Sequence, residues 1–177
     1  FDQVGTDWSR GTRDAVEYLL GRGHRRILYS GLDGIEWSDD RQAAFLTAMR
    51  RAGLWDMEYP APVVTFPGAM EYEAPGAPAR AAYTTAAANL HATLLREPAD
   101  AVICANDQLA MDLAAVAPLS ELPELVGFDN TLWAKEHGVT SVGMDLRRHA
   151  DTVFNLLASP PAEHTRLVRI PTLLTVR

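Results

Sequence analysis

Polar and aromatic residues stand at the ends of three strands that the sequence predicts and at the segment GTD near residue 7. In chain order they are Asp7 and Trp8, then Asp33, Trp37, Ser38 and Arg41, then Asn106 and Asp107, and finally Asp129, Asn130 and Trp133. Carboxylates and amides exchange hydrogen bonds with pairs of hydroxyl groups, and arginine adds a planar fork of donors. Tryptophan can cover the apolar face of a sugar ring, and a buried polar ligand needs its hydroxyls paired. The set therefore indicates a binding site for a sugar or a similar polyol.

Several of these residues also have a purely structural explanation, which the sequence leaves open. Asn106 or Asp107 can cap the helix that follows them. Trp133 suits a packing or subunit contact as well as a ligand wall. Arg41 and Asp129 favour binding more strongly. Arg41 stands in the predicted first turn of its helix, where a cation is slightly unfavourable, and Asp129 ends a buried strand with no helix pattern directly behind it.

The elements that must position these residues alternate between apolar strands and helices. The predicted strands are RRILYSG, APVVTF, AVICAN, LVGFDN and TSVGM, with an extended tail, LVRIPTLLTV. The predicted helices are GTRDAVEYLLGRG, one beginning at Asp39 or Asp40, Ala81–Leu95, DQLAMDLAAV and LRRHADTVFNLLAS. Continuous apolar strands indicate a sheet that is buried on both faces. The predicted fold class is α/β, a Rossmann-like parallel sheet with helices on both faces, which binds ligands beyond the carboxyl ends of its strands.

Composition and missing motifs argue against several other functions. The formal net charge of −7 disfavours DNA binding by this chain alone, and the short cluster His24, Arg25 and Arg26 fits a solvated helix end. Cys104 lies in an apolar run and is expected in the core, and no metal or cofactor is expected. Glycine-rich phosphate loops and a nucleophile elbow are missing, which disfavours an enzyme. No apolar run approaches the roughly 20 residues that cross a bilayer, and no signal peptide is visible.

Five sequence blocks together resemble the LacI/GalR family of transcription regulators. The blocks, in the family's order, are VGTDWSRGTRDAVEYLLGRGHRRI, SDDRQAAFLTAMRRAGL, AVICANDQLAMDLA, LVGFDN and GVTSVGMDLRRHA. The resemblance implies a periplasmic-binding-protein-like type I fold, in which two Rossmann-like subdomains enclose a ligand cleft. It implies that this chain is incomplete in that fold. Residues 1–140 would form the C-terminal subdomain, 141–158 a return segment that packs on the N-terminal subdomain, and 159–177 the final strands of the C-terminal subdomain.

The resemblance also implies roles for particular residues. Positions that bind effector in the family correspond here to Asp7, Arg41, Asn106 and Asp129, with Phe66 as the aromatic residue that stacks on the ligand. Trp8, Trp37 and Trp133 are the further candidate ligand contacts. The residues expected at a dimer interface are Met111, Asp112, Ala115, Leu132, Trp133 and Glu136. Three departures from the family pattern are a shortened stretch over 111–125, a glycine at position 143 and a longer loop over 67–78.

The expected function is effector sensing in a cytoplasmic, dimeric regulator, a repressor in the first instance. Its partners would be a small-molecule effector, a second copy and operator DNA, the last only through a headpiece outside this chain, with no membrane partner. The resemblance does not separate a LacI-type from a GntR-type headpiece. One alternative is a sugar-binding protein of a transporter, and a more distant one is an enzyme on a flavodoxin-like sheet.

Overall fold

The computed structural model describes residues 2–57, 61–67, 78–159 and 164–177. The strands are β1 (Gln3–Asp7), β2 (Ile27–Asp33), β3 (Val63–Pro67), β4 (Ala101–Cys104), β5 (Glu124–Phe128), β6 (Thr140–Met144) and β7 (Leu167–Thr175). The helices are α1 (Trp8–Gly21), α2 (Glu36–Arg51), α3 (Pro78–Arg96), α4 (Asp107–Val116), α5 (Leu132–Glu136) and α6 (Leu146–Ala158), with a 3-10 turn, η1 (Leu119–Glu121). Most of the loop expected over 67–78 lies outside the described residues. None of the described helices is long and apolar enough to span a membrane.

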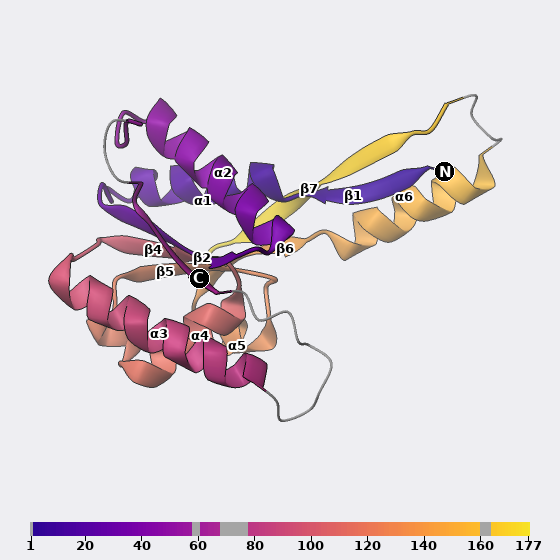
Figure 1. Cartoon of the computed structure of the whole chain (residues 1–177). Helices are drawn as coiled ribbons and strands as arrows, with labels where there is room; N and C mark the ends of the chain where they lie inside the picture. The colour runs from indigo at the N-terminus through magenta and orange to yellow at the C-terminus, as the bar shows by residue number, and fades with distance from the viewer. Residues whose placement is uncertain (1, 58–60, 68–77, 160–163) are drawn as a thin grey trace.

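The strands form one sheet in the order β1-β7-β6-β5-β4-β2-β3. Helices α1 and α2 cover one face and α3, α4 and α5 the other, which confirms the predicted α/β class (Figure 1). The core under α1 and α2 contains Tyr29 and Phe45, and the core under α3 and α4 contains Leu90 and Leu109. The sheet is not entirely parallel, because β7 pairs parallel with β1 but antiparallel with β6.

Strand β1, helix α6 and the adjoining part of β7 project from the main body as an arm (Figure 1). No residue of α6 is buried. Its apolar residues Leu146, Phe154 and Leu157 are 68%, 71% and 78% exposed. The segment expected to leave the subdomain at residue 141 begins inside the main sheet, since Ser141 and Val142 pair with β5. The arm therefore carries an apolar surface that nothing in the described chain covers.

Helix α2 begins earlier than the sequence predicts. Its N-cap is Ile35, whose carbonyl accepts hydrogen bonds from the amides of Ser38 and Asp39, both at 2.9 Å. Asp39 is therefore an acid within the first turn, where it complements the helix dipole, rather than a cap. Arg41 consequently lies beyond the first turn, so the argument that a cation is unfavourable at its position is wrong.

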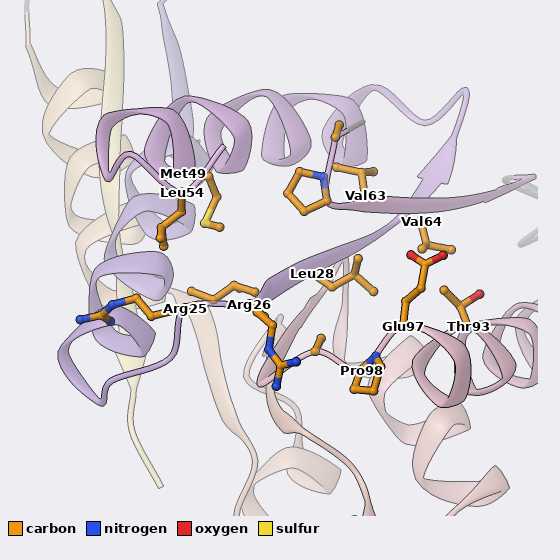
Figure 2. A pocket seen from close by; sticks show the side chains of 14 residues that line it. Arg25, Arg26, Leu28, Met49, Leu54, Val63, Val64, Thr93, Glu97 and Pro98 are labelled. Carbon is orange, nitrogen blue, oxygen red and sulfur yellow. The ribbon is translucent and has the colours of Figure 1, made fainter. Parts of the chain in front are cut away.

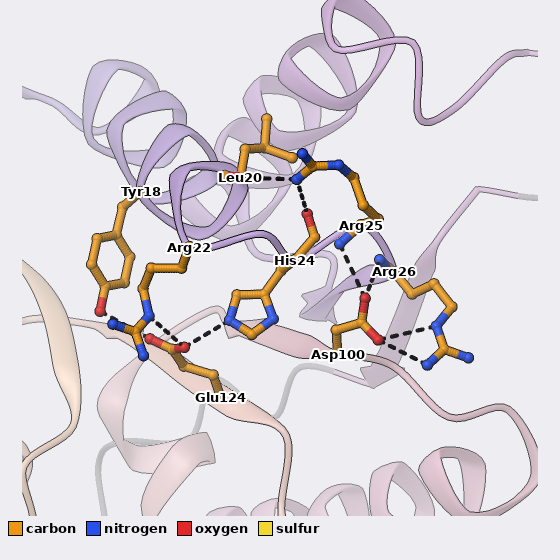
Figure 3. A network of polar contacts seen from close by, with 8 residues as sticks. All are labelled: Tyr18, Leu20, Arg22, His24, Arg25, Arg26, Asp100 and Glu124. Atoms are coloured by element: carbon orange, nitrogen blue, oxygen red, sulfur yellow. Dashed lines mark hydrogen bonds and ion pairs between the residues drawn. The ribbon is translucent and has the colours of Figure 1, made fainter.

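The basic cluster after α1 ties the helix end to two strands (Figure 3). Glu124, at the start of β5, accepts hydrogen bonds from Arg22 Nε at 2.8 Å and Tyr18 Oη at 2.9 Å, and its Oε2 lies 2.7 Å from His24 Nε2. Asp100, just before β4, accepts from the amides of residues 25 and 26 at 3.0 and 2.9 Å. Helix α1 ends at Gly21 with no basic residue in its last turn, so the cluster lies in the loop after the helix, where its contacts hold that loop to the amino ends of β4 and β5.

Candidate functional site

The guanidinium of Arg41 is the centre of the site that the structure assembles. The residue is only 3% exposed, and its guanidinium carbon lies 4.2 Å from the ring centre of Trp8, 4.3 Å from Phe128 and 4.8 Å from Trp37. These rings come from α1, β5 and α2, so three separate elements meet around one charge. Aromatic faces attract a cation through their quadrupole, most strongly where water is excluded.

Besides the three aromatic rings, the guanidinium of Arg41 has two polar partners. Its Nη1 donates to the carbonyl of Ala105, and its Nη2 lies 3.7 Å from Oδ1 of Asp129. Its Nε is buried with no hydrogen-bond partner among the described residues. Burial lowers the pKa of the Arg41 guanidinium, and the charge of Asp129 opposes that change. A buried donor without a partner is costly, so this nitrogen favours an acceptor supplied from outside the chain.

Asp129 sits where β5 turns away from the sheet. Its φ of 92° and that of Asn130, 49°, are positive, which is uncommon for residues other than glycine. The amide of Asp129 donates to the carbonyl of Val142 at 2.8 Å, while its side chain is half-exposed. Burial raises the pKa of the Asp129 carboxyl, and the charge of Arg41 works in the opposite direction. The carboxylate thus lies beside Arg41 at the rim and still faces solvent.

Two other predicted ligand residues hold helix ends. Asp7 is the N-cap of α1 and accepts a hydrogen bond from the amide of Arg10 at 2.9 Å. Asn106 is the N-cap of α4, accepts from the amide of Leu109 at 2.9 Å, and donates to Tyr83 Oη at 3.1 Å. Both side chains therefore have a structural role, and a contact with ligand would be an additional one.

The predicted aromatic residues divide between the two faces of the sheet. Trp8 and Trp37 lie against Arg41, and Trp8 meets Phe128 edge-on, with ring centres 6.1 Å apart. Phe66 is buried in the core under α3 and α4, and Trp133 packs against that core with its ring stacked on His137. No described contact joins Phe66 or Trp133 to Arg41, so their assignment to the ligand site stays a prediction.

One residue of this site, Phe128, was not predicted from the sequence, and the role of another, Asp107, was left open. Phe128 was read only as part of a strand, although its ring lies under the guanidinium of Arg41. Asp107 was read as a possible helix cap, but the cap is Asn106. The carboxylate of Asp107 is buried and accepts hydrogen bonds from Thr131 and Ser141. Its position directly after a capping asparagine was a signal that its side chain was free for another partner.

Two cavities among the described residues lie away from this rim. One of about 360 Å³ is found at the amino ends of β2 and β3, lined by Leu28, Met49, Leu54, Val64 and Glu97 among others (Figure 2). Another of about 300 Å³ lies at the amino ends of β5 and β6. Neither includes Arg41 or Asp129, which belong to the opposite edge.

The arrangement defines a class of protein: an α/β domain with a polar and aromatic rim at the carboxyl ends of its strands. Comparisons with known proteins agree with this class. Residues 16–177 match the family described as periplasmic binding protein-like domain, and the chain belongs to that family. A search of curated proteins finds no match to this sequence.

Solved structures of LacI-family regulators share the fold. A regulatory protein from Chloroflexus aggregans has 23% identity and a TM-score of 0.73, covering 100% of this chain and 63% of its own. A regulator from a Rhodococcus species has 25% identity and a TM-score of 0.73, with 97% and 62% covered. The transcriptional regulator CelR in complex with cellobiose has 23% identity and a TM-score of 0.70, with 99% and 53% covered. This chain thus spans between about half and two thirds of these relatives.

Proposed function

We propose that this chain is the effector-sensing portion of a DNA-binding transcription regulator of the LacI type. The observation that carries the proposal is the buried Arg41, held by three aromatic rings with one donor unsatisfied and the Asp129 carboxylate beside it. In the bound state, Arg41 would donate to a sugar hydroxyl and Asp129 would accept from one. Trp8 or Trp37 would lie against the apolar face of the ring. The cellobiose complex of CelR, a similar fold, supports a sugar as the effector class.

The rest of the proposed site follows the family resemblance. Asp7 and Asn106 would contact the effector in addition to capping their helices, with Phe66 and Trp133 as more distant walls. The second wall of the cleft would come from an N-terminal subdomain, which the relatives' greater length supports. We propose the division into residues 1–140, 141–158 and 159–177, with the exposed apolar surface of α6 packed on that subdomain.

The mechanism is a shift between two conformations and involves no bond chemistry. An effector that binds the closed arrangement of the subdomains better than the open one favours closure. Closure would change the spacing of two DNA-binding headpieces in a cytoplasmic dimer and release operator DNA. The proposed dimer surface lies on α4 and α5, where Leu132, Ala115 and Glu136 are exposed.

A thermal-shift screen of the full-length protein tests the proposal. The panel would contain D-ribose, D-glucose, D-galactose and cellobiose, with nucleobases and polyols as comparison classes. We expect at least one sugar to raise the melting temperature and to weaken operator binding in a gel-shift assay. In Arg41→Met and Asp129→Asn both responses should be lost.

The surface residue Asp40 offers a matched control, because Asp40→Asn changes an exposed acid on the same helix as Arg41. It should leave both responses intact. A protein that responds to none of these compounds, or responses that survive in both rim variants, would contradict the assignment. Operator binding itself would be absent if the chain belonged to a transporter's binding protein.

A further inference from the structure

The carboxylate of Asp107 is a buried junction between three elements. It is 1% exposed, and its Oδ2 accepts hydrogen bonds from the amide and the hydroxyl of Thr131, both at 2.8 Å. Its Oδ1 accepts from the hydroxyl of Ser141 at 2.8 Å. The hydroxyl oxygen of Ser141 in turn accepts from the amide of Asn130 at 3.0 Å. One side chain of α4 is therefore bonded to the loop after β5 and to β6.

Two glycines on neighbouring strands leave room for this junction. A Cβ at Gly127 would lie 2.0 Å from Oδ1 of Asp107, and a Cβ at Gly143 would lie 2.7 Å from the Cβ of Asn130. A larger residue at either position would displace the carboxylate or the loop. Gly143, a departure from the family pattern, thus has a structural explanation in this chain.

The junction holds a loop whose backbone conformation is unfavourable on its own. Asp129 and Asn130 both have positive φ, and such residues persist only where their surroundings fix them. The junction binds two amides of this loop. The amide of Asn130 donates to the hydroxyl of Ser141, and the amide of Thr131 donates to the carboxylate of Asp107. The loop conformation places the carboxylate of Asp129 3.7 Å from Arg41.

Asp107 is not needed to cap α4, because Asn106 already accepts the hydrogen bond from the amide of Leu109. Each donor to its carboxylate among the described residues belongs to the Asp129–Thr131 loop or to β6. We propose that Asp107 is a positioning residue, which fixes the loop from Asp129 to Thr131 and thereby sets the Asp129 carboxylate against Arg41 for effector binding. The part that concerns effector rests on the function proposed above.

Two variants of the full-length protein each remove one hydroxyl of the junction without changing its charge. Thr131→Val deletes the hydroxyl donor to Asp107 together with the side-chain cap of α5, and Ser141→Ala deletes the donor to Oδ1 of Asp107 together with the link to Asn130. Each has a matched control. Thr131→Ser keeps the hydroxyl, and Ser30→Ala removes another fully buried strand hydroxyl, one with no hydrogen-bond partner among the described residues.

The readouts are taken at Asp129, which none of these variants alters directly. Its amide bonds to Val142, so its exchange rate reports the loop and not the deleted hydroxyl. We expect exchange at least about tenfold faster in both junction variants, with the amides of β4 unchanged. Because burial raises the pKa of Asp129, that pKa should fall toward its ordinary value in the same variants. The two control variants should match the unmodified protein.

Sugar affinity provides the second arm, measured by calorimetry with D-ribose and with cellobiose. Thr131→Val and Ser141→Ala should weaken binding about tenfold, and Thr131→Ser should restore it. An unchanged exchange rate and pKa at Asp129 in both junction variants would overturn the proposal. So would a loosened loop with unchanged sugar affinity. If neither sugar binds even the unmodified protein, the proposed effector class fails, while the readouts at Asp129 still decide the role of Asp107.

Discussion

Replacing Arg41 with methionine should separate the binding role of this residue from its role in the fold. Methionine keeps the apolar bulk between Trp8, Trp37 and Phe128 but removes the charge. Leaving the carbonyl of Ala105 without its donor costs about 1–3 kcal/mol. Removing the buried charge of Arg41 also removes its desolvation penalty, which is on the order of several kcal/mol. The loss of the cation–π attraction to the three rings offsets part of this gain.

These opposing contributions leave a small net change. We expect Arg41→Met to alter the free energy of unfolding by less than about 1.5 kcal/mol. Arg41→Ala also leaves a cavity among the three rings and should lose about 2–5 kcal/mol. Urea denaturation at neutral pH measures both values. The sugar-induced thermal shift should disappear in both variants.

The carboxyl of Asp129 gives an independent check on the same reasoning. The charge of Arg41 lowers the pKa of Asp129, although burial raises it overall. Loss of the charge in Arg41→Met should therefore raise that pKa further, as measured by NMR titration. If Arg41→Met is as unstable as Arg41→Ala, the guanidinium itself holds the fold together. The separation of binding from stability would then be refuted.

Three further predictions follow from the described geometry. Gly127→Ala should destabilise the protein by about 1–3 kcal/mol in urea, because its Cβ would overlap the carboxylate of Asp107; an unchanged midpoint would contradict that packing. The pKa of Asp100 is lowered from 3.8 to about 2 by hydrogen bonds from residues 25 and 26, so its contribution to stability is present above about pH 4 and is lost as the pH falls toward 2. Asp100→Asn should flatten the stability profile over that interval, and an equally steep profile would argue against the interaction. Phe154→Ser and Leu157→Ser should change the stability of the isolated chain by less than about 0.5 kcal/mol, but that of the full-length protein by about 1–3 kcal/mol each. Equal effects in both forms would count against packing of α6 on another subdomain.

Local patterns predicted most of the architecture and the centre of the site. The bounds of α4 coincide with the predicted DQLAMDLAAV helix, because its cap and apolar spacing lie within one short segment. Arg41 and Asp129 were preferred on local grounds that were wrong, because Arg41 lies beyond the first turn of α2 and helix α5 begins shortly after Asp129. The structure nevertheless brings the two side chains together. The spacing of residues did not indicate the class of protein, and the family resemblance was needed to predict it.

Features that depend on distant residues were not predictable in this way. The burial of Asp107 requires space at Gly127 and a donor at Ser141, and nothing in the local sequence indicates either contact. Phe128 looked like any apolar strand residue until the fold placed it under Arg41. The direction of β7 was missed because an apolar run has no direction until its neighbours are known.

The position of β7 in the sheet has a consequence for how the chain folds. Among the described strands β1 pairs only with β7, and the partners Gln3 and Leu167 are far apart in the sequence. Contacts between such distant residues form slowly, because the loop must close before they contribute any stability. During synthesis, β1 would leave the ribosome long before β7 and could pair with it only after β7 had emerged. The remaining strands could already form a sheet in that interval, so we expect the arm to dock in a late, separate kinetic phase.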